Sequence, residues 1–186
     1  IVLLGAFGAW ELHTDHPMLD LRFFKNPRFS AASGSITLVF FAMFGSMFLL
    51  TQYLQFVLAY SPLETGVRML PFAATMMVAA PASAKITEKV GTKVIVAGGL
   101  GLVTIGLLSM TGLQVDTSYG GVVIRLMLIA LGMAFVMAPA TESVMGSLPL
   151  AKAGVGSAVN DTTRQVGGAL GVAIIGSVLS STYGPK

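Results

Sequence analysis

The stretch Gly154–Ser181, GVGSAVNDTTRQVGGALGVAIIGSVLSS, joins a polar half to an apolar half. A helix needs about 20 residues, at roughly 1.5 Å each, to cross the hydrocarbon core of a bilayer. The apolar half, Val166–Leu179, is too short for this, so we expect the polar half to enter the membrane as well. Arg164 then lies on the order of 15 Å inward from Gly154. A charge at that depth faces protein or water and marks a candidate functional site.

The composition of the whole chain also indicates a membrane protein. The 186 residues are 54% hydrophobic and 10% charged, and the mean hydropathy is +0.82. Soluble domains carry about 25% charged residues, so this balance argues against a soluble globular domain. The pI near 9.4 comes from short basic loops, and we expect no nucleic acid as a partner. Without cysteine, and with only His13 and His16 as imidazoles, the chain is not expected to bind a metal.

Hydrophobic runs separated by turn signals predict an all-α, polytopic transmembrane helix bundle. Ile1–Ala9 is interpreted as the end of a preceding transmembrane helix. Trp10–Arg28 is interpreted as a cytoplasmic amphipathic linker that lies in the lipid interface, or else as an ordinary connecting loop. Residues 29–186 are expected to form about five complete spans. These spans are predicted at residues 29–56, 62–84, 94–113, 121–145 and 154–181.

Short polar segments set the ends and the orientation of the spans. Ser61–Glu64, SPLE, has the residue types and spacing of a capping box that starts a helix. Gly91 is the expected helix stop within the tight basic turn Lys85–Lys93. The linker, this turn and the loop at Lys152 collect most basic residues on one side. The positive-inside rule assigns that side to the cytoplasm.

Polar residues within the spans are candidates for a coupling site. Asn160 and Arg164 are four residues apart and Asp161 and Arg164 three apart, so either pair is in reach on a helix. An Asp–Arg pair is the least costly way to hold two charges in a membrane, and a proton or a substrate cation could switch it. The pattern predicts either a site where proton and substrate compete or a structural clamp between helices. Glu142 and Arg125, in the fourth span, are further candidates.

Phenylalanine and methionine residues form a stripe along the first span, and two glutamines stand at its far end. Such a wall suits bulky apolar ligands, because methionine surfaces adapt to many shapes. The alternative is that these phenylalanines face lipid or neighbouring helices. The candidate residues of the substrate cavity are Phe44, Met47, Phe48, Gln52 and Gln55.

Gly167 and Gly171 form a GxxxG pattern, which allows close contact with a partner helix. The contact is expected either to serve tight packing alone or to slide during alternating access. The chain contains no zinc-protease, nucleophile-elbow or phosphate-loop motif, so we do not expect an enzyme.

Three stretches resemble the major facilitator superfamily and, more narrowly, its drug:proton antiporter family with 14 transmembrane spans. They are HPMLDLRFFKNPRFS, YSPLETGVRMLP, and APATESVMGSLP followed by AGVGSAVNDTTRQVGGALGVAIIGSVL. The resemblance covers nearly the whole chain. It implies that residues 29–186 are an incomplete C-terminal bundle of a longer transporter.

The turn after the second span is similar to the superfamily's cytoplasmic loop motif, GxLaDrxGrk. It departs from the motif at Ala84, in place of glycine, and at Thr92, in place of a basic residue. The residues that match are Glu88, Lys89, Gly91 and Lys93.

The resemblance implies a multidrug efflux transporter of the plasma (inner) membrane. It would exchange protons for amphipathic or cationic compounds by alternating access, with the proton gradient as energy source and no cofactor. Its implied partners are small amphipathic substrates, protons, the lipid bilayer and the N-terminal transmembrane half of the same transporter. The alternatives are an exporter of a native lipid or metabolite and a non-transporting membrane module for assembly or partner binding.

Overall fold

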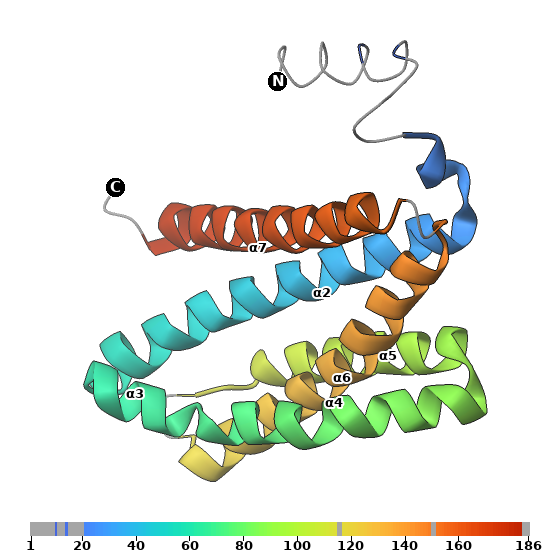
Figure 1. Cartoon of the computed structure of the whole chain (residues 1–186). Helices are drawn as coiled ribbons and strands as arrows, with labels where there is room; N and C mark the ends of the chain where they lie inside the picture. The colour runs from blue at the N-terminus through green and yellow to red at the C-terminus, as the bar shows by residue number, and fades with distance from the viewer. Residues whose placement is uncertain (1–9, 11–13, 15–20, 115–116, 150–151, 184–186) are drawn as a thin grey trace.

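The computed structural model is a bundle of helices, without a strand in the residues that it describes (Figure 1). Those residues are 10, 14, 21–114, 117–149 and 152–183, so the expected helix end at 1–9 lies outside them. The elements are the 3-10 turn η1 (Leu21–Lys25), α2 (Pro27–Gln52), the π turn η2 (Tyr53–Val57), α3 (Pro62–Arg68), α4 (Leu70–Val90), α5 (Thr92–Met110), α6 (Tyr119–Gly146) and α7 (Ala153–Tyr183).

Five helical stretches of the described residues are long and apolar enough to cross a membrane. They are Pro27–Val57, Pro62–Val90, Thr92–Met110, Tyr119–Gly146 and Ala153–Thr182. Each contains an 18-residue window of high mean hydropathy, close to the length that a bilayer core requires. The predicted fold class, an all-α polytopic bundle of five spans, is therefore confirmed.

The helix ends differ most from the expected spans at the second one. α4 continues to Val90, past the expected end at Ala84, because Lys and Glu in Lys85–Val90 are good helix formers. Gly91 then stops the helix with φ of 82°, a conformation that glycine adopts without strain. The basic turn expected over Lys85–Lys93 is thus a single residue between two helices.

The start of the second span has the capping box that its sequence predicted. The Ser61 Oγ accepts from the Glu64 backbone N–H at 3.3 Å, and a Glu64 carboxylate oxygen accepts from the Ser61 backbone N–H at 2.8 Å. The helix is interrupted at Met69, and Pro71 stands in the first turn of α4. Because proline needs no backbone donor there, the span bends without losing a hydrogen bond.

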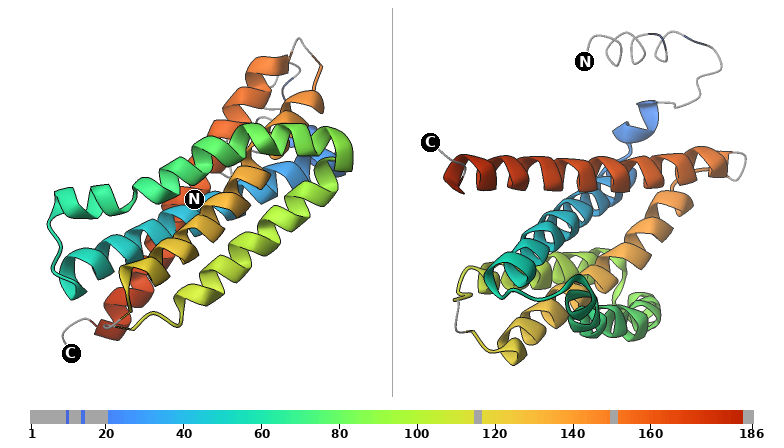
Figure 2. Two further views of the ribbon diagram at one scale, coloured as in Figure 1. Left: turned by 90° about the horizontal axis from the view of Figure 1, so that it is seen from below. Right: turned by 90° about the vertical axis from the view of Figure 1, so that its left-hand side faces the viewer.

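α6 is the central helix of the bundle. It packs on α5, α4 and α2, whereas α7 packs mainly on α2. In the left view of Figure 2, α6 runs between α4 and α5. In the most apolar window of each helix, 44% of α6 is buried but only 17% of α7 and 11% of the span that contains α4. The outer helices therefore present wide apolar faces to their surroundings.

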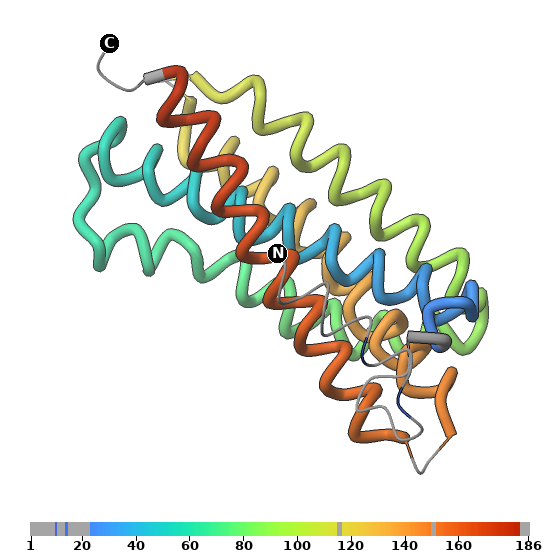
Figure 3. Tube along the Cα trace, turned by 90° about the horizontal axis from the view of Figure 1, so that it is seen from above, coloured from blue at the N-terminus to red at the C-terminus, as the bar shows by residue number. Residues whose placement is uncertain are grey.

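α2 and α7 run side by side in the same direction (Figure 3). A Cβ added at Gly167 would meet the carbonyl oxygen of Thr37, and one added at Gly171 would meet that of Phe41. These two glycines therefore bring the backbones together, at the spacing that the sequence singled out. We call this contact the α2–α7 seam.

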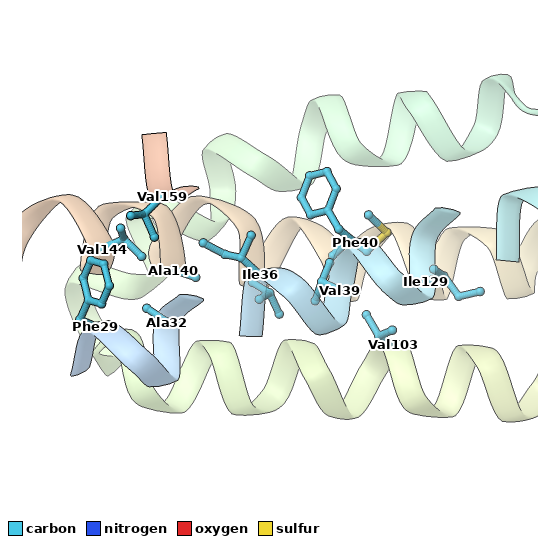
Figure 4. Close-up of a cluster of buried hydrophobic side chains, with 12 residues drawn as sticks. Phe29, Ala32, Ile36, Val39, Phe40, Val103, Ile129, Ala140, Val144 and Val159 are labelled. Atoms are coloured by element: carbon cyan, nitrogen blue, oxygen red, sulfur yellow. The ribbon is translucent and has the colours of Figure 1, made fainter. Parts of the chain in front are cut away.

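The core gathers where α2, α6 and α5 face one another, with α7 beside them (Figure 4). Its fully buried members include Phe29, Ile36, Val39, Ile129, Val136 and Val144. A smaller cluster of Leu50, Leu54, Val122 and Leu126 lies toward the other end of the bundle. We call the two ends the Gly91 end and the Tyr60 end, after the turns found there.

Candidate functional site

The polar run of the last span lies inside a helix. α7 is continuous from Ala153 to Tyr183, so it carries Asn160 through Gln165 in its first half, toward the Gly91 end. Asn160 is 7% exposed, Arg164 is half-buried and Asp161 is exposed. Three residues on adjacent turns thus have three different surroundings.

Arg164 and Asn160 meet on one hydroxyl of α6. The Nη2 of Arg164 donates to Thr141 Oγ1 at 3.1 Å, and Thr141 Oγ1 donates to Asn160 Oδ1 at 3.4 Å. The guanidinium carbon lies 5.3 Å from the centre of the Phe40 ring on α2, within the range of a cation–π contact. We call Phe40, Thr141, Asn160 and Arg164 the polar cluster; it joins α2, α6 and α7.

The predicted carboxylates lie outside this cluster. Asp161 and Glu142 are exposed, on α7 and α6 respectively. Within the described residues, Arg164 bonds to the hydroxyl of a neighbouring helix rather than to Asp161 of its own helix. Both carboxylates are therefore accessible from outside the helices that the structure describes.

Arg125 is separate from the polar cluster. It precedes Thr141 by 16 positions on α6, which corresponds to roughly 24 Å along a helix. Its Nη1 atom is buried without a hydrogen-bond partner in the described part of the chain. Its Nη2 points toward the end of α5, since a Cβ added at Gly112 would lie 3.7 Å from it. The structure therefore places Arg125 and Arg164 toward opposite ends of the bundle.

A cavity of about 860 Å³ opens toward the Tyr60 end. This volume falls in the range of sites for drug-sized ligands. The π turn η2 forms part of its wall, and such turns are frequent at functional sites. Its lining includes Met43, Ser46, Met47, Leu50, Gln52, Tyr53, Phe72, Met110, Leu126, Ile129, Ile175 and Leu179.

The candidate cavity residues of α2 divide between two sides of the helix. Met47 and Gln52 line the cavity, and Gln55 is half-buried in η2 outside the lining. Phe44 and Phe48 face α7 instead: a Cβ added at Gly168 would lie 3.0 Å from the Phe44 ring, and one at Gly176 would lie 3.7 Å from the Phe48 ring. The i, i+4 spacing kept these two rings on one face, but that face packs on the last helix.

Sequence reasoning missed several residues that the fold brings together. Thr141, which receives the Arg164 bond, is 23 positions away in sequence, and Phe40 is still farther. The cavity wall likewise takes Phe72, Met110 and Leu126 from three different helices. Each of them resembles any other apolar or hydroxyl residue of a span, so no local pattern could have singled them out.

The residues that match the cytoplasmic loop motif surround the turn between α4 and α5. The side chains of Glu88, Lys89 and Lys93 are exposed. Gly91 supplies the positive φ that lets the two helices meet. The charges thus flank the turn at the Gly91 end.

Comparison with known proteins places this arrangement in a family. The sequence model of the Major Facilitator Superfamily matches residues 8–172. The chain belongs to the major facilitator superfamily. This confirms the coarser resemblance, and it identifies the chain as part of a transporter family of the membrane rather than an enzyme.

The relatives carry names that refer to drug resistance and export. The chain is 33% identical over 177 residues to the multidrug resistance protein Stp of Mycobacterium tuberculosis. It is 31% identical over 184 residues to the tetracenomycin C resistance and export protein of Streptomyces glaucescens, and 28% identical over 183 residues to the multidrug efflux pump LfrA of Mycolicibacterium smegmatis.

These alignments cover 95%, 99% and 98% of this chain, but 33%, 34% and 36% of the respective relatives. The chain thus spans about a third of the length of the curated relatives it matches.

Proposed function

We propose that this chain works within a drug:proton antiporter with 14 spans in the plasma (inner) membrane. The transporter exports amphipathic, often cationic, compounds in exchange for protons by alternating access. The names of the relatives support export of drugs. Their greater length supports a partner in the form of an N-terminal half.

The observation that carries the proposal is the position of Asp161. It is an exposed carboxylate in a helix that is otherwise apolar enough to span a membrane. Arg164, one turn away, is engaged with Thr141. A lone carboxylate at this depth is costly and calls for a proton, a cation or a covering polar group. Competition between proton and substrate cation for one carboxylate is what an antiporter needs.

The cavity at the Tyr60 end supports binding of a bulky apolar body. Its wall is mainly methionine, leucine and aromatic side chains, and its few polar groups include Ser46 and Gln52. Methionine side chains adapt to different ligand shapes. The same lining favours a second candidate function, export of a native lipid-like compound, which differs in substrate but not in site.

The α2–α7 seam and the polar cluster each have a structural role in the proposed transport cycle. In the proposed cycle, α2 and α7 move together as one unit, because Gly167 and Gly171 hold the two backbones in close contact. The polar cluster ties this unit to α6. A clamp of this kind would keep the helices in place while the exposed Asp161 exchanges its proton.

The experiment is transport by the purified transporter in liposomes with an imposed pH gradient. We expect Asp161→Asn to slow gradient-driven uptake of a cationic dye about tenfold or more, a change of roughly 1.4 kcal/mol, because an amide can neither release a proton nor attract a cation. Uptake of a neutral dye should change less. The matched control is Glu64→Gln, the same chemical change at an exposed position where glutamine can keep the capping box.

Equal loss for both dyes, with less folded protein in the membrane, would show that Asp161 is structural. A transporter that moves neither dye but binds another protein specifically would support the partner-binding module instead.

A further inference from the structure

The guanidinium of Arg164 has more donors than the described residues satisfy. It carries five N–H groups. One, on Nη2, donates to Thr141 Oγ1 at 3.1 Å. The Nε atom is buried and has no hydrogen-bond partner in the part of the chain that the structure describes. A buried donor without a partner is destabilising, more so when it carries charge.

The positive charge of Arg164 also lacks a partner carboxylate within the described residues. Asp161 and Glu142 are close in sequence to Arg164 and to Thr141, yet both are exposed while the Nε atom is buried. The Phe40 ring lies near the guanidinium at 5.3 Å and supplies only a weak attraction. The site is therefore electropositive and incompletely bonded.

The geometry indicates which anion fits. The Nε hydrogen and one Nη2 hydrogen lie on the same edge of the guanidinium, and the second Nη2 hydrogen can serve Thr141 Oγ1. The two oxygens of a carboxylate match this edge and form a bidentate pair. A carboxylate also neutralises one guanidinium, whereas a phosphate dianion would leave an excess charge in the membrane.

We infer that Arg164, with Thr141 beside it and Phe40 near its face, anchors a carboxylate-binding site between α2, α6 and α7. The carboxylate has two possible sources: a substrate, or an acidic residue of the transporter outside the described residues. The first source rests on the proposed function and narrows the substrate class to amphiphiles with a carboxylate. A zwitterion could then place its amine near Asp161, one helical turn away.

The test compares two dyes that differ in one group, a fluorescent xanthene dye with a free carboxylate and its ethyl ester. Binding to the purified transporter in detergent is measured by fluorescence anisotropy. Arg164→Gln removes the charge, and Arg164→Lys keeps it but loses the bidentate edge. Arg28→Gln, the same change at an exposed position in the first turn of α2, is the matched control.

If the substrate supplies the carboxylate, Arg164→Gln weakens binding of the acid dye about tenfold or more and that of the ester less than about twofold. Arg164→Lys gives an intermediate loss for the acid dye. Arg28→Gln changes neither. This pattern holds even if no dye is transported, so it separates the carboxylate site from the proposed antiport.

If the transporter supplies the carboxylate, Arg164→Gln affects both dyes alike and lowers the thermal midpoint. Neutralising the one Asp or Glu that pairs with Arg164 then restores the midpoint in the double variant, because an unpaired buried charge is removed. The inference is overturned if the variant does not discriminate between the dyes and no acidic residue gives this rescue.

Discussion

α2 packs tightly along one side and borders open space along the other. On the α7 side, the seam brings Gly167 and Gly171 against the carbonyl oxygens of Thr37 and Phe41. On the other side, residues such as Met47 border a cavity of about 860 Å³. The comparison teaches that one helix can hold a neighbour rigidly while its opposite side stays free to accommodate ligands. The glycines serve the first purpose and the methionines the second.

The largest expected effect comes from filling the tight side. Gly171→Ala places a Cβ against the Phe41 carbonyl oxygen, which belongs to backbone and cannot rotate away. We expect the free energy of unfolding to fall by roughly 3 kcal/mol, the upper end for overpacking. The measurement is thermal unfolding of the purified protein in detergent, followed by loss of helical circular dichroism.

The control for this variant is the same substitution at Gly34 on α2. A Cβ added there meets nothing within 4 Å, so Gly34→Ala should be neutral or stabilising by up to about 1 kcal/mol through helix propensity. Equal unfolding midpoints for the two variants would mean that the α2–α7 seam can accommodate an extra methyl group. The two sides of α2 would then not differ in packing.

A smaller effect is expected from filling the open side. Leu107 lines the cavity, so Leu107→Trp should weaken binding of a bulky apolar dye about tenfold, which is 1.4 kcal/mol. Leu108→Trp is the matched control, because the Leu108 side chain, next to Leu107 on α5, is 65% exposed. The measurement compares the affinity for the dye of the Leu107→Trp and Leu108→Trp variants. Undiminished binding in Leu107→Trp would place the ligand elsewhere.

Much of the fold was predictable because the spans are long and their ends carry local signals. The capping box at Ser61 and the glycine stop at Gly91 both lie where residue type alone dictates the backbone. The helix α4 extends past the expected end of the second span, because Lys85–Val90 stays helical although its charges were taken to indicate a turn. Charged side chains do not end a helix that can project beyond the hydrocarbon.

The candidate site was less predictable because it depends on which faces meet. The spacing of Asn160, Asp161 and Arg164 located the polar run but allowed an Asp–Arg pair, whereas Arg164 turns to Thr141 on another helix. Likewise, Phe44 and Met47 belong to one stripe in sequence, yet one faces α7 and the other the cavity. Rotation of a helix about its axis is set by packing, which no single stretch encodes.

The smallest expected effect concerns the hydroxyl that links the polar cluster to α6. Thr141→Val keeps the shape of the side chain but removes the acceptor for Arg164 and the donor for Asn160. We expect a loss of about 1 kcal/mol in unfolding free energy, typical of a net hydrogen bond. Thr104→Val is the control, because that exposed hydroxyl donates only to the Leu100 carbonyl oxygen of its own helix. If both valine variants unfold at the wild-type temperature, the Thr141 bonds do not stabilise the bundle, and apolar packing on α2 and α6 holds α7.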